Sequence, residues 1–305
     1  MSKQWRIALL LGVAMAISVF ISACGGSSTG SGGSTPTASS GGPGKLTCVS
    51  GTITADGSTA LAPLVQKVAA SYEKKCSGAS ITVNLGGSKT GLSDVEAGNV
   101  QIGNSDIFHL TNQTDLVDHQ VAVVVFVFTV NSKVTGVTNL TTDQIKMIYS
   151  GQATNWKQVG GPDLPIVVVS RPASSGTRAT FQKYILGGPE KISGPSSLVS
   201  DSTGTVATEI QQTSGAIGYI TLGQAKKSNL TPLNIDGYAP TPSLAESNTY
   251  KFWNIEHMYT KGQPTGLTQA FINYMTSSDA KSIAAGLSFI SITDMQQSAL
   301  QAHQS

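Results

Sequence analysis

Three short β-type runs in this chain each lead through a loop of glycine, serine and threonine into a helical run. Such a loop presents free backbone N–H groups, small hydroxyls and the positive end of a helix dipole, which together suit a bound oxyanion. One loop of this kind is more often a turn or a helix cap, whereas three in one chain predict a single enclosed anion. The loops are residues 56–59, 86–91 and 171–177.

Strand and helix patterns alternate along the chain, which predicts βαβ units, a largely parallel sheet and an α/β fold. Residues 121–130 are apolar throughout, as expected of a strand buried on both faces. Thr141 and Gln144 form a capping-box pattern, and Ser58 or Thr59 suits the N-cap of the first helix. The other expected strands are residues 52–55, 81–85, 101–104, 166–170 and 216–220, and the other expected helices are a run with Leu61 to Tyr72 on one face, a short helix after Gly91, and residues 178–186, 267–275 and 280–287.

The N-terminus, residues 1–23, reads as an export signal. Lys3 and Arg6 precede an uncharged apolar run that ends at Cys24. Small residues before this cysteine are similar to the lipobox of bacterial lipoproteins, in which Cys24 becomes the lipidated N-terminus. An uncleaved membrane anchor is the alternative. Either interpretation places the rest of the chain outside the cytoplasm and held at the cell membrane, in a periplasm or on the outer face of the cytoplasmic membrane.

Residues 24–47 contain almost only Gly, Ser, Thr, Ala and Pro, so they are expected to form a disordered linker. The folded region then starts at Cys48. In an oxidising compartment, Cys48 and Cys76 are expected to form a disulfide that joins the start of this region to the end of its first helix. Two free buried thiols remain the alternative, because spacing alone does not prove a bridge.

The mature chain is formally neutral. Without Lys3 and Arg6, 17 basic side chains balance 17 acidic ones. A neutral chain without a basic run argues against nucleic acid as a partner, so affinity for an anion must come from a local site. The four histidines are scattered without the spacing of a metal site, and neither a metal nor a cofactor is expected.

Short motifs are spaced along most of the folded region. They are Gly57-Ser58-Thr59 with Pro63, Gly87-Ser88 with Gly91, Ile102 with Ser105-Asp106, Leu140-Thr141 with Ile148 and Gly151, Asn155-Trp156, Gly160-Gly161-Pro162, Arg171, Ser175-Gly176-Thr177, Phe181, and Gly215-Ala216-Ile217-Gly218-Tyr219. In this order, and behind a lipobox, they resemble the phosphate-binding proteins of bacterial phosphate ABC transporters.

The resemblance implies a two-lobe, type II periplasmic-binding-protein-like α/β fold. In such a fold, two crossing segments form a hinge, and the lobes close on a ligand in the cleft between them. Lobe 1 would comprise residues 48–125 and 251–305, and lobe 2 residues 126–250. The resemblance further implies a monomeric lipoprotein that is not an enzyme, and that captures inorganic phosphate and delivers it to the membrane permease subunits of an ABC transporter.

Family positions carried over one at a time imply a phosphate-binding set drawn from the three loops and the third strand. Arg171 offers a planar fork of donors that suits a tetrahedral oxyanion. Asp106 is an acceptor among donors, which is tolerated only if the ligand carries a proton, as phosphate does near neutral pH and sulfate does not. The set is Ser58, Thr59, the backbone N–H of Ala60, Ser88, Asp106, Arg171, Ser175, Gly176 and Thr177.

The chain departs from the family beside Arg171. Ala173 stands where the family usually has an acidic residue, and Ser174 where glycine is common. An acid there would pair with the arginine and temper its attraction for the anion, so affinity and oxyanion choice stay open. A receptor for sulfate or molybdate, a phosphate sensor and a secreted phosphohydrolase are the alternatives, the last without a placed nucleophile, base or metal set. Lys89 is an extra cation in the second loop, expected at its exposed rim.

Overall fold

The computed structural model describes residues 44–191 and 197–304, which all belong to one compact unit. The expected signal peptide, Cys24 and residues 24–43 of the expected linker lie outside the described residues. The last linker residues are described and contact the folded region, since the Gly44 N–H donates to the Asn273 carbonyl at 2.9 Å. Within the described ranges, no helix is long and apolar enough to cross a membrane.

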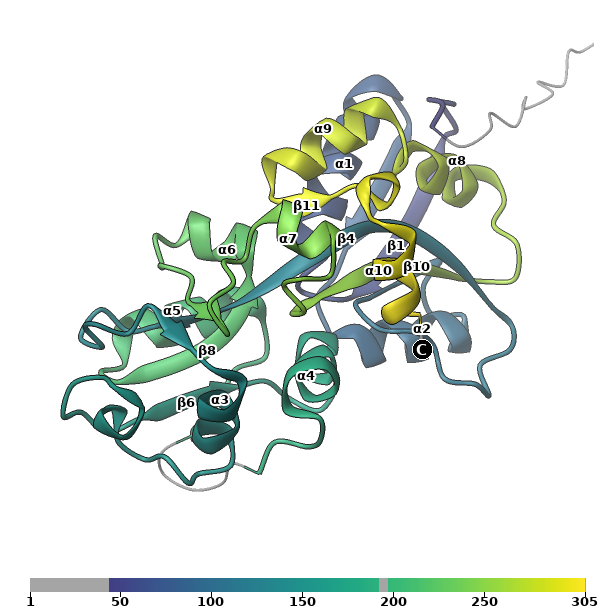
Figure 1. Ribbon diagram of the computed structural model, residues 1–305. Coiled ribbons are helices and arrows are strands. Elements are labelled where there is room, and N and C mark those ends of the chain that lie inside the picture. Colours follow the sequence, from purple (N-terminus) through teal and green to yellow (C-terminus); the bar gives the residue numbers. More distant parts are fainter. Residues whose placement is uncertain (1–43, 192–196, 305) are drawn as a thin grey trace, which may run out of the picture. The chain divides into compact units, whose positions relative to one another are not determined.

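A mixed sheet of nine strands forms the centre of the described structure (Figure 1). Its strands follow the order β2-β1-β3-β10-β4-β8-β6-β7, and β11 pairs with β4 outside this path. A separate two-stranded sheet contains β5 and β9. The strands are β1 (Gly51–Gly57), β2 (Ala79–Val83), β3 (Ile102–Ser105), β4 (Leu116–Val130), β5 (Asn139–Leu140), β6 (Val167–Ser170), β7 (Ser197–Val199), β8 (Ala216–Thr221), β9 (Asn234–Ile235), β10 (Trp253–Lys261) and β11 (Phe289–Ile290).

The expectation of a largely parallel sheet is wrong at the centre of the sheet. The outer pairs are parallel, namely β1 with β2 and β3, and β6 with β7 and β8. In contrast, β10 is antiparallel to both β3 and β4, and β4 is antiparallel to β8. The reason is that β4 carries the chain from one half of the sheet to the other and β10 lies on its return, so the two neighbours run in opposite directions.

Strand β4 changes partner along its length. Residues 116–125 pair with β10, and residues 126–130 pair with β8. We call β2, β1, β3, β10 and residues 116–125 the first half of the sheet, and residues 126–130, β8, β6 and β7 the second half. The apolar run is buried as predicted, but the strand starts earlier, at Leu116. The apolar pattern did not predict its first part because that part carries partly exposed polar residues such as His119 and Gln120.

Helices pack on each half of the sheet. Helices α1, α2 and α8 contact strands of the first half, while α5 and α6 contact strands of the second half. The helices are α1 (Ala62–Lys75), α2 (Ser88–Ala97), α3 (Thr142–Tyr149), α4 (Gly176–Phe181), α5 (Thr203–Gln212), α6 (Leu222–Lys227), α7 (Pro242–Glu246), α8 (Gly266–Tyr274), α9 (Ser278–Gly286) and α10 (Gln297–Ala302), with short 3₁₀ segments η1 (Trp156–Val159) and η3 (Ile292–Asp294) and a π-helical turn η2 (Gln182–Leu186) that continues α4.

Two helix starts differ from expectation. Helix α1 begins at Ala62 with no side-chain cap, and the Ser58 hydroxyl instead accepts from the N–H groups of Ala60 and Leu61, at 3.1 and 3.0 Å. Helix α2 begins at Ser88 rather than after Gly91. Gly91 therefore lies inside the helix. A Cβ at this position would be 2.5 Å from the Asp56 carbonyl oxygen, so the glycine permits a close approach to β1 and does not mark a loop.

The capping box of α3 is present as predicted. Thr141 Oγ1 accepts from the Gln144 N–H at 3.1 Å, and Gln144 Oε1 accepts from the Thr141 N–H at 2.8 Å. Helix α4 begins at Gly176, two residues before the expected start, because the Ser175 hydroxyl caps it by accepting from the Arg178 N–H at 3.2 Å. The first turn of α4 therefore belongs to the third Gly/Ser/Thr loop.

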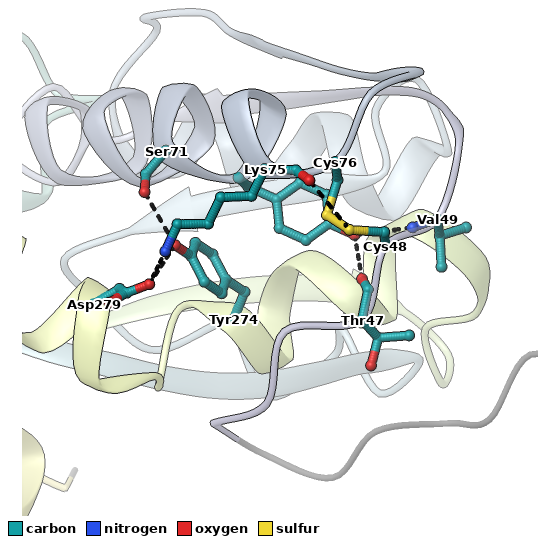
Figure 2. The surroundings of a disulfide bond; sticks show 9 residues. Thr47, Cys48, Val49, Ser71, Lys75, Cys76, Tyr274 and Asp279 are labelled. Atoms are coloured by element: carbon teal, nitrogen blue, oxygen red, sulfur yellow. Dashed lines mark hydrogen bonds and ion pairs between the residues drawn. A yellow bond between two sulfur atoms is a disulfide. The ribbon is translucent and has the colours of Figure 1, made fainter.

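Cys48 and Cys76 form the expected disulfide (Figure 2). Cys76 directly follows α1, and the two Cα atoms lie 5.0 Å apart. The hydroxyl of Tyr72, in the last turn of α1, donates to the Thr47 carbonyl at 2.6 Å and accepts from the Val49 N–H at 3.2 Å. The bridge and these hydrogen bonds join the start of the folded region to the end of its first helix.

The double variant Cys48→Ser/Cys76→Ser is expected to lose about 3 kcal/mol of unfolding free energy. The bridge spans a sequence separation of 28 residues, and its loss restores the loop entropy of the unfolded chain. For a domain of this size, the melting temperature should fall by about 6–12 °C in scanning calorimetry. Reduced wild-type protein should melt with the variant, and equal melting temperatures for the variant and oxidised wild type would contradict the prediction.

Candidate functional site

The three loops predicted from the sequence meet at one place. The first loop begins at the end of β1, the second runs into α2, and the third follows β6 and runs into α4. Arg171 Nη2 of the third loop donates to Thr59 Oγ1 of the first loop at 3.0 Å. The Lys89 N–H of the second loop donates to the Ser174 carbonyl of the third loop at 3.1 Å. Elements of both halves of the sheet therefore form one site.

Asp106 lies at the centre of this meeting point, directly after β3, and is buried. The Ser58 hydroxyl donates to its Oδ1, and the Thr177 hydroxyl donates to its Oδ2 at 3.0 Å. Its backbone N–H donates to Ser88 Oγ at 2.9 Å. Asp106, through its carboxylate and its backbone N–H, thus contacts one residue from each of the three loops.

Burial raises the pKa of the Asp106 carboxyl above its ordinary value. The hydroxyls of Ser58 and Thr177 and the positive charge of Arg171 lower it again. Each of these groups favours the ionised form, because each is a donor or a cation facing a carboxylate. The arrangement is that of an acceptor held among donors.

Arg171 is the buried cation of the site, with 1% of its surface exposed. Its Nε donates to the Ser200 carbonyl at 3.0 Å, and its Nη2 donates to the Asp201 carbonyl at 3.1 Å. Among the described residues it forms no ion pair, so its hydrogen-bond acceptors are neutral oxygens. Ala173, in the same loop, offers no carboxylate to the guanidinium.

A fourth Gly/Ser/Thr loop completes the site and was missed in the sequence. Residues 201–205 lead into α5, and Thr203 is buried. Thr59 Oγ1 accepts from the Thr203 N–H at 3.2 Å, and Arg171 Nη1 donates to Thr203 Oγ1 at 3.4 Å. The sequence Ser202-Thr203-Gly204-Thr205 has the same composition as the other three loops, so the pattern that found them could also have found this one.

The remaining predicted residues, Ala60, Ser88 and Ser175, also lie at the site. The backbone N–H of Ala60 already has a hydrogen-bond acceptor within the protein. The Ala60 N–H donates to Ser58 Oγ at 3.1 Å. Ser88 and Ser175 are buried, and Ser175 accepts from α4 as its cap. Helix α4 begins at Gly176, beside Ser88 and Asp106, so its N-terminal end lies at the same place. Lys89 is exposed, as expected for a residue at the rim.

Gly176 marks a close approach between elements of the two halves. A Cβ at this position would overlap Ser88 Oγ and lie 2.9 Å from Asp106 Cβ. Ser88 and Asp106 belong to the first half of the sheet, whereas Gly176 starts α4 after β6 of the second half. Glycine is thus required here for contact between the halves, and not for an unusual backbone angle.

The variant Gly176→Ala is expected to bind the ligand of this site at least tenfold more weakly, because the added methyl group keeps the halves apart. The apo protein should keep its melting temperature within a few degrees, since the overlap is relieved when the halves separate. Gly188→Ala is the matched control, because nothing lies within 4 Å of a Cβ there. Unchanged affinity for Gly176→Ala in calorimetry would contradict the prediction.

A groove of about 730 Å³ opens beside the site, next to Thr59 and Thr203. Its charged lining residues are Lys67, Lys226 and Lys227, all exposed. Positive charge at this mouth favours the approach of an anion. In residues 44–191 and 197–304, no group of three or more His, Cys, Asp or Glu side chains is placed to hold a metal ion.

The fold and site define a class of protein. The family model described as PBP superfamily domain matches residues 42–279. The solved structure of a substrate-binding protein from Clostridium perfringens, with bound phosphate, has a TM-score of 0.74 at 29% identity, over 79% of this chain and 100% of that chain. An ABC-type phosphate transport receptor from Vibrio cholerae has a TM-score of 0.64 at 29% identity, over 78% and 99% of the two chains. The protein thus has the two-lobe α/β fold of periplasmic binding proteins, as predicted.

Two relatives narrow the class. Phosphate-binding protein PstS of Bacillus subtilis (strain 168) is 43% identical over 252 residues, covering 81% of this chain and 83% of the relative. Phosphate-binding protein PstS of Borreliella burgdorferi is 28% identical over 248 residues, covering 77% and 88%. The chain belongs to the family of phosphate-binding proteins of bacterial phosphate ABC transporters, which confirms the resemblance seen in the sequence.

Proposed function

We propose that this protein captures one inorganic phosphate ion between its two lobes and delivers it to the permease of an ABC transporter. The observation that carries the proposal is the buried Asp106 carboxylate, which accepts from hydroxyls of both halves, Ser58 and Thr177, beside the buried cation Arg171. The names of the relatives, phosphate-binding proteins and a phosphate transport receptor, support the choice of ligand.

Phosphate near neutral pH is an anion that still carries a proton. In the proposed complex, the guanidinium of Arg171 donates to phosphate oxygens, and the hydroxyls and N–H groups of the loops complete the shell of donors. The phosphate O–H donates to the Asp106 carboxylate. The proposed ligands are Ser58, Thr59, the Ala60 N–H, Ser88, Asp106, Arg171, Ser175, Gly176 and Thr177, and Thr203 positions Thr59 and Arg171.

Sulfate has the same shape as phosphate but no proton at neutral pH. Its oxygens would face the Asp106 carboxylate with no proton between them, so two negatively charged groups would repel each other in a buried site. Without an acid at position 173, Arg171 attracts any oxyanion, so the proposed discrimination between phosphate and sulfate comes from the acceptor Asp106. This makes a receptor for sulfate or molybdate the weaker alternative.

We further propose that lobe 1 comprises residues 48–125 and 251–305 and lobe 2 residues 126–250. The change of partner along β4 after Val125 supports this division. At the proposed hinge, the Phe126 N–H donates to the Phe252 carbonyl at 2.9 Å, and the Tyr250 hydroxyl donates to the Phe126 carbonyl at 2.8 Å. Ligand contacts from both lobes would stabilise the closed form, and the permease would distinguish it from the open form by shape.

Phosphate binding is tested by calorimetry on purified, phosphate-stripped protein, with sulfate, molybdate and arsenate as competitors. Heat with another oxyanion but not with phosphate would exclude the proposed ligand and spare the fold. Phosphate turnover from an ester would instead favour the phosphohydrolase alternative. Phosphate uptake in membrane vesicles that contain the neighbouring permease separates a transport receptor from a sensor.

The proposed attachment to the membrane is through lipidated Cys24, with residues 25–47 as a tether. At about 5–6 Å times the square root of its length, such a tether keeps the binding lobes on the order of 25 Å from the membrane, within reach of a permease. Mass spectrometry of the membrane-extracted protein tests this. An N-terminus other than an acylated Cys24 would overturn the anchor without affecting phosphate binding.

A further inference from the structure

Glu256 is a fully buried carboxyl group on β10, behind the site. Strand β10 pairs with β3 so that His257 lies opposite Ser105, which places Glu256 at the level of Asp106. Asn254 lies two residues earlier and on the same face of β10, and its amide donates to the Asp106 carbonyl at 2.7 Å. This face of β10 is therefore directed at Asp106.

The carboxyl of Glu256 interacts with the carboxyl of Asp106. No described residue donates a hydrogen bond to either oxygen of Glu256. Two carboxyl groups can bond only if one of them carries a proton, and a buried charge without a donor is costly. The pair therefore holds one proton between its two members.

The proton lies on Glu256 because the surroundings of the two groups differ. Asp106 faces the Arg171 cation and the hydroxyls of Ser58 and Thr177, which stabilise its negative charge. Glu256 faces no cation, and its neighbour on β4 is Ala122. Burial first, and then the charge of Asp106, raise the pKa of Glu256 well above its ordinary value. The imidazole of His257 belongs to the other face of β10, where it bonds to Asp118 at 2.8 Å.

We propose that neutral Glu256 is a positioning residue that donates a hydrogen bond to the Asp106 carboxylate and so keeps Asp106 an acceptor for the ligand's proton. This inference rests on the proposed phosphate function and deepens it. Selectivity for a protonated oxyanion then depends on a pair of carboxyl groups, of which only Asp106 contacts the ligand.

If the Glu256 donor is lost, the selectivity for phosphate over sulfate should depend on pH. Without the hydrogen bond from Glu256, the pKa of Asp106 rises, so its carboxyl gains a proton at a higher pH than in wild type. Protonated Asp106 is a donor, which can bond to an unprotonated sulfate oxygen. Selectivity for phosphate over sulfate should therefore fall as the pH is lowered, and recover as the pH is raised.

The test compares Glu256→Leu, which removes the donor at similar size, with Glu256→Gln, whose amide keeps a donor. Phosphate and sulfate affinities are measured by calorimetry between about pH 5.5 and about pH 8. We expect the selectivity of the Leu variant for phosphate over sulfate to be at least tenfold lower at about pH 5.5 than at about pH 8, while the Gln variant follows the wild type. Identical pH profiles for the Leu and Gln variants would overturn the proposal.

Infrared difference spectroscopy provides a second test that needs no unstable variant and no ligand. Wild-type protein at neutral pH should show the carbonyl band of a protonated carboxyl group, and this band should vanish in Glu256→Gln. Persistence of the band in Glu256→Gln, or its absence in wild type, would overturn the proposal. A wild-type protein that binds no phosphate would instead overturn the proposed function, so the two failures are distinct.

Discussion

Replacing Arg171 by alanine is expected to lower phosphate affinity at least 100-fold. Arg171 is buried, and its donors are charged, so each hydrogen bond to the anion contributes about 1.5–3 kcal/mol. Two such bonds correspond to a factor of 100 or more in Kd. The measurement is a calorimetric titration of phosphate-stripped protein, with circular dichroism to show that the variant is folded.

Lys89→Gln is the matched control, because it removes one positive charge from the neighbouring loop at an exposed position. Exposed charges are screened by solvent, so its affinity should change less than threefold. Similar losses in the two variants would mean that Arg171 acts through general charge and does not bind the anion directly.

Replacing Asp106 by asparagine should change which oxyanion is bound more than how tightly phosphate is bound. The amide removes the buried negative charge and offers an N–H to an unprotonated oxygen. We expect phosphate affinity to fall by about tenfold and the preference for phosphate over sulfate to fall by about 100-fold, since the negative charge that repels sulfate is gone. Competition between the two ions in calorimetry measures both.

Asp118→Asn serves as its control, because this carboxylate pairs with His257 on the other face of β10 and not with the site. Its selectivity should match the wild type. An Asp106→Asn protein that still rejects sulfate as wild type does would show that another group sets the selectivity.

Local patterns in the sequence were enough to predict much of the site. The three loops were found because loop composition is a local feature, and the resemblance to a known family singled out Asp106 and Arg171 by their short local motifs. The capping box of α3 was predictable for the same reason. The disulfide was expected because Cys48 and Cys76 are the two cysteines of the folded region in an oxidising compartment. For the loops and the capping box, a few neighbouring residues carry the signal.

Features that depend on distant contacts were not predictable. The antiparallel centre of the sheet requires knowing that β4 and β10 become neighbours, although more than 100 residues separate them. Glu256 looks like an ordinary charged residue in the sequence, and only its burial beside Asp106 gives it a role. Gly91 reads as a loop residue because its close contact with β1 is invisible without the fold.

The crystal structure of the protein with phosphate tests the central claim most directly. We predict one phosphate ion that contacts residues of both lobes, with Arg171 donating to its oxygens and one of its oxygens within hydrogen-bond distance of the Asp106 carboxylate. A phosphate ion that contacts only one lobe, or that lies away from Asp106 and Arg171, would contradict the account.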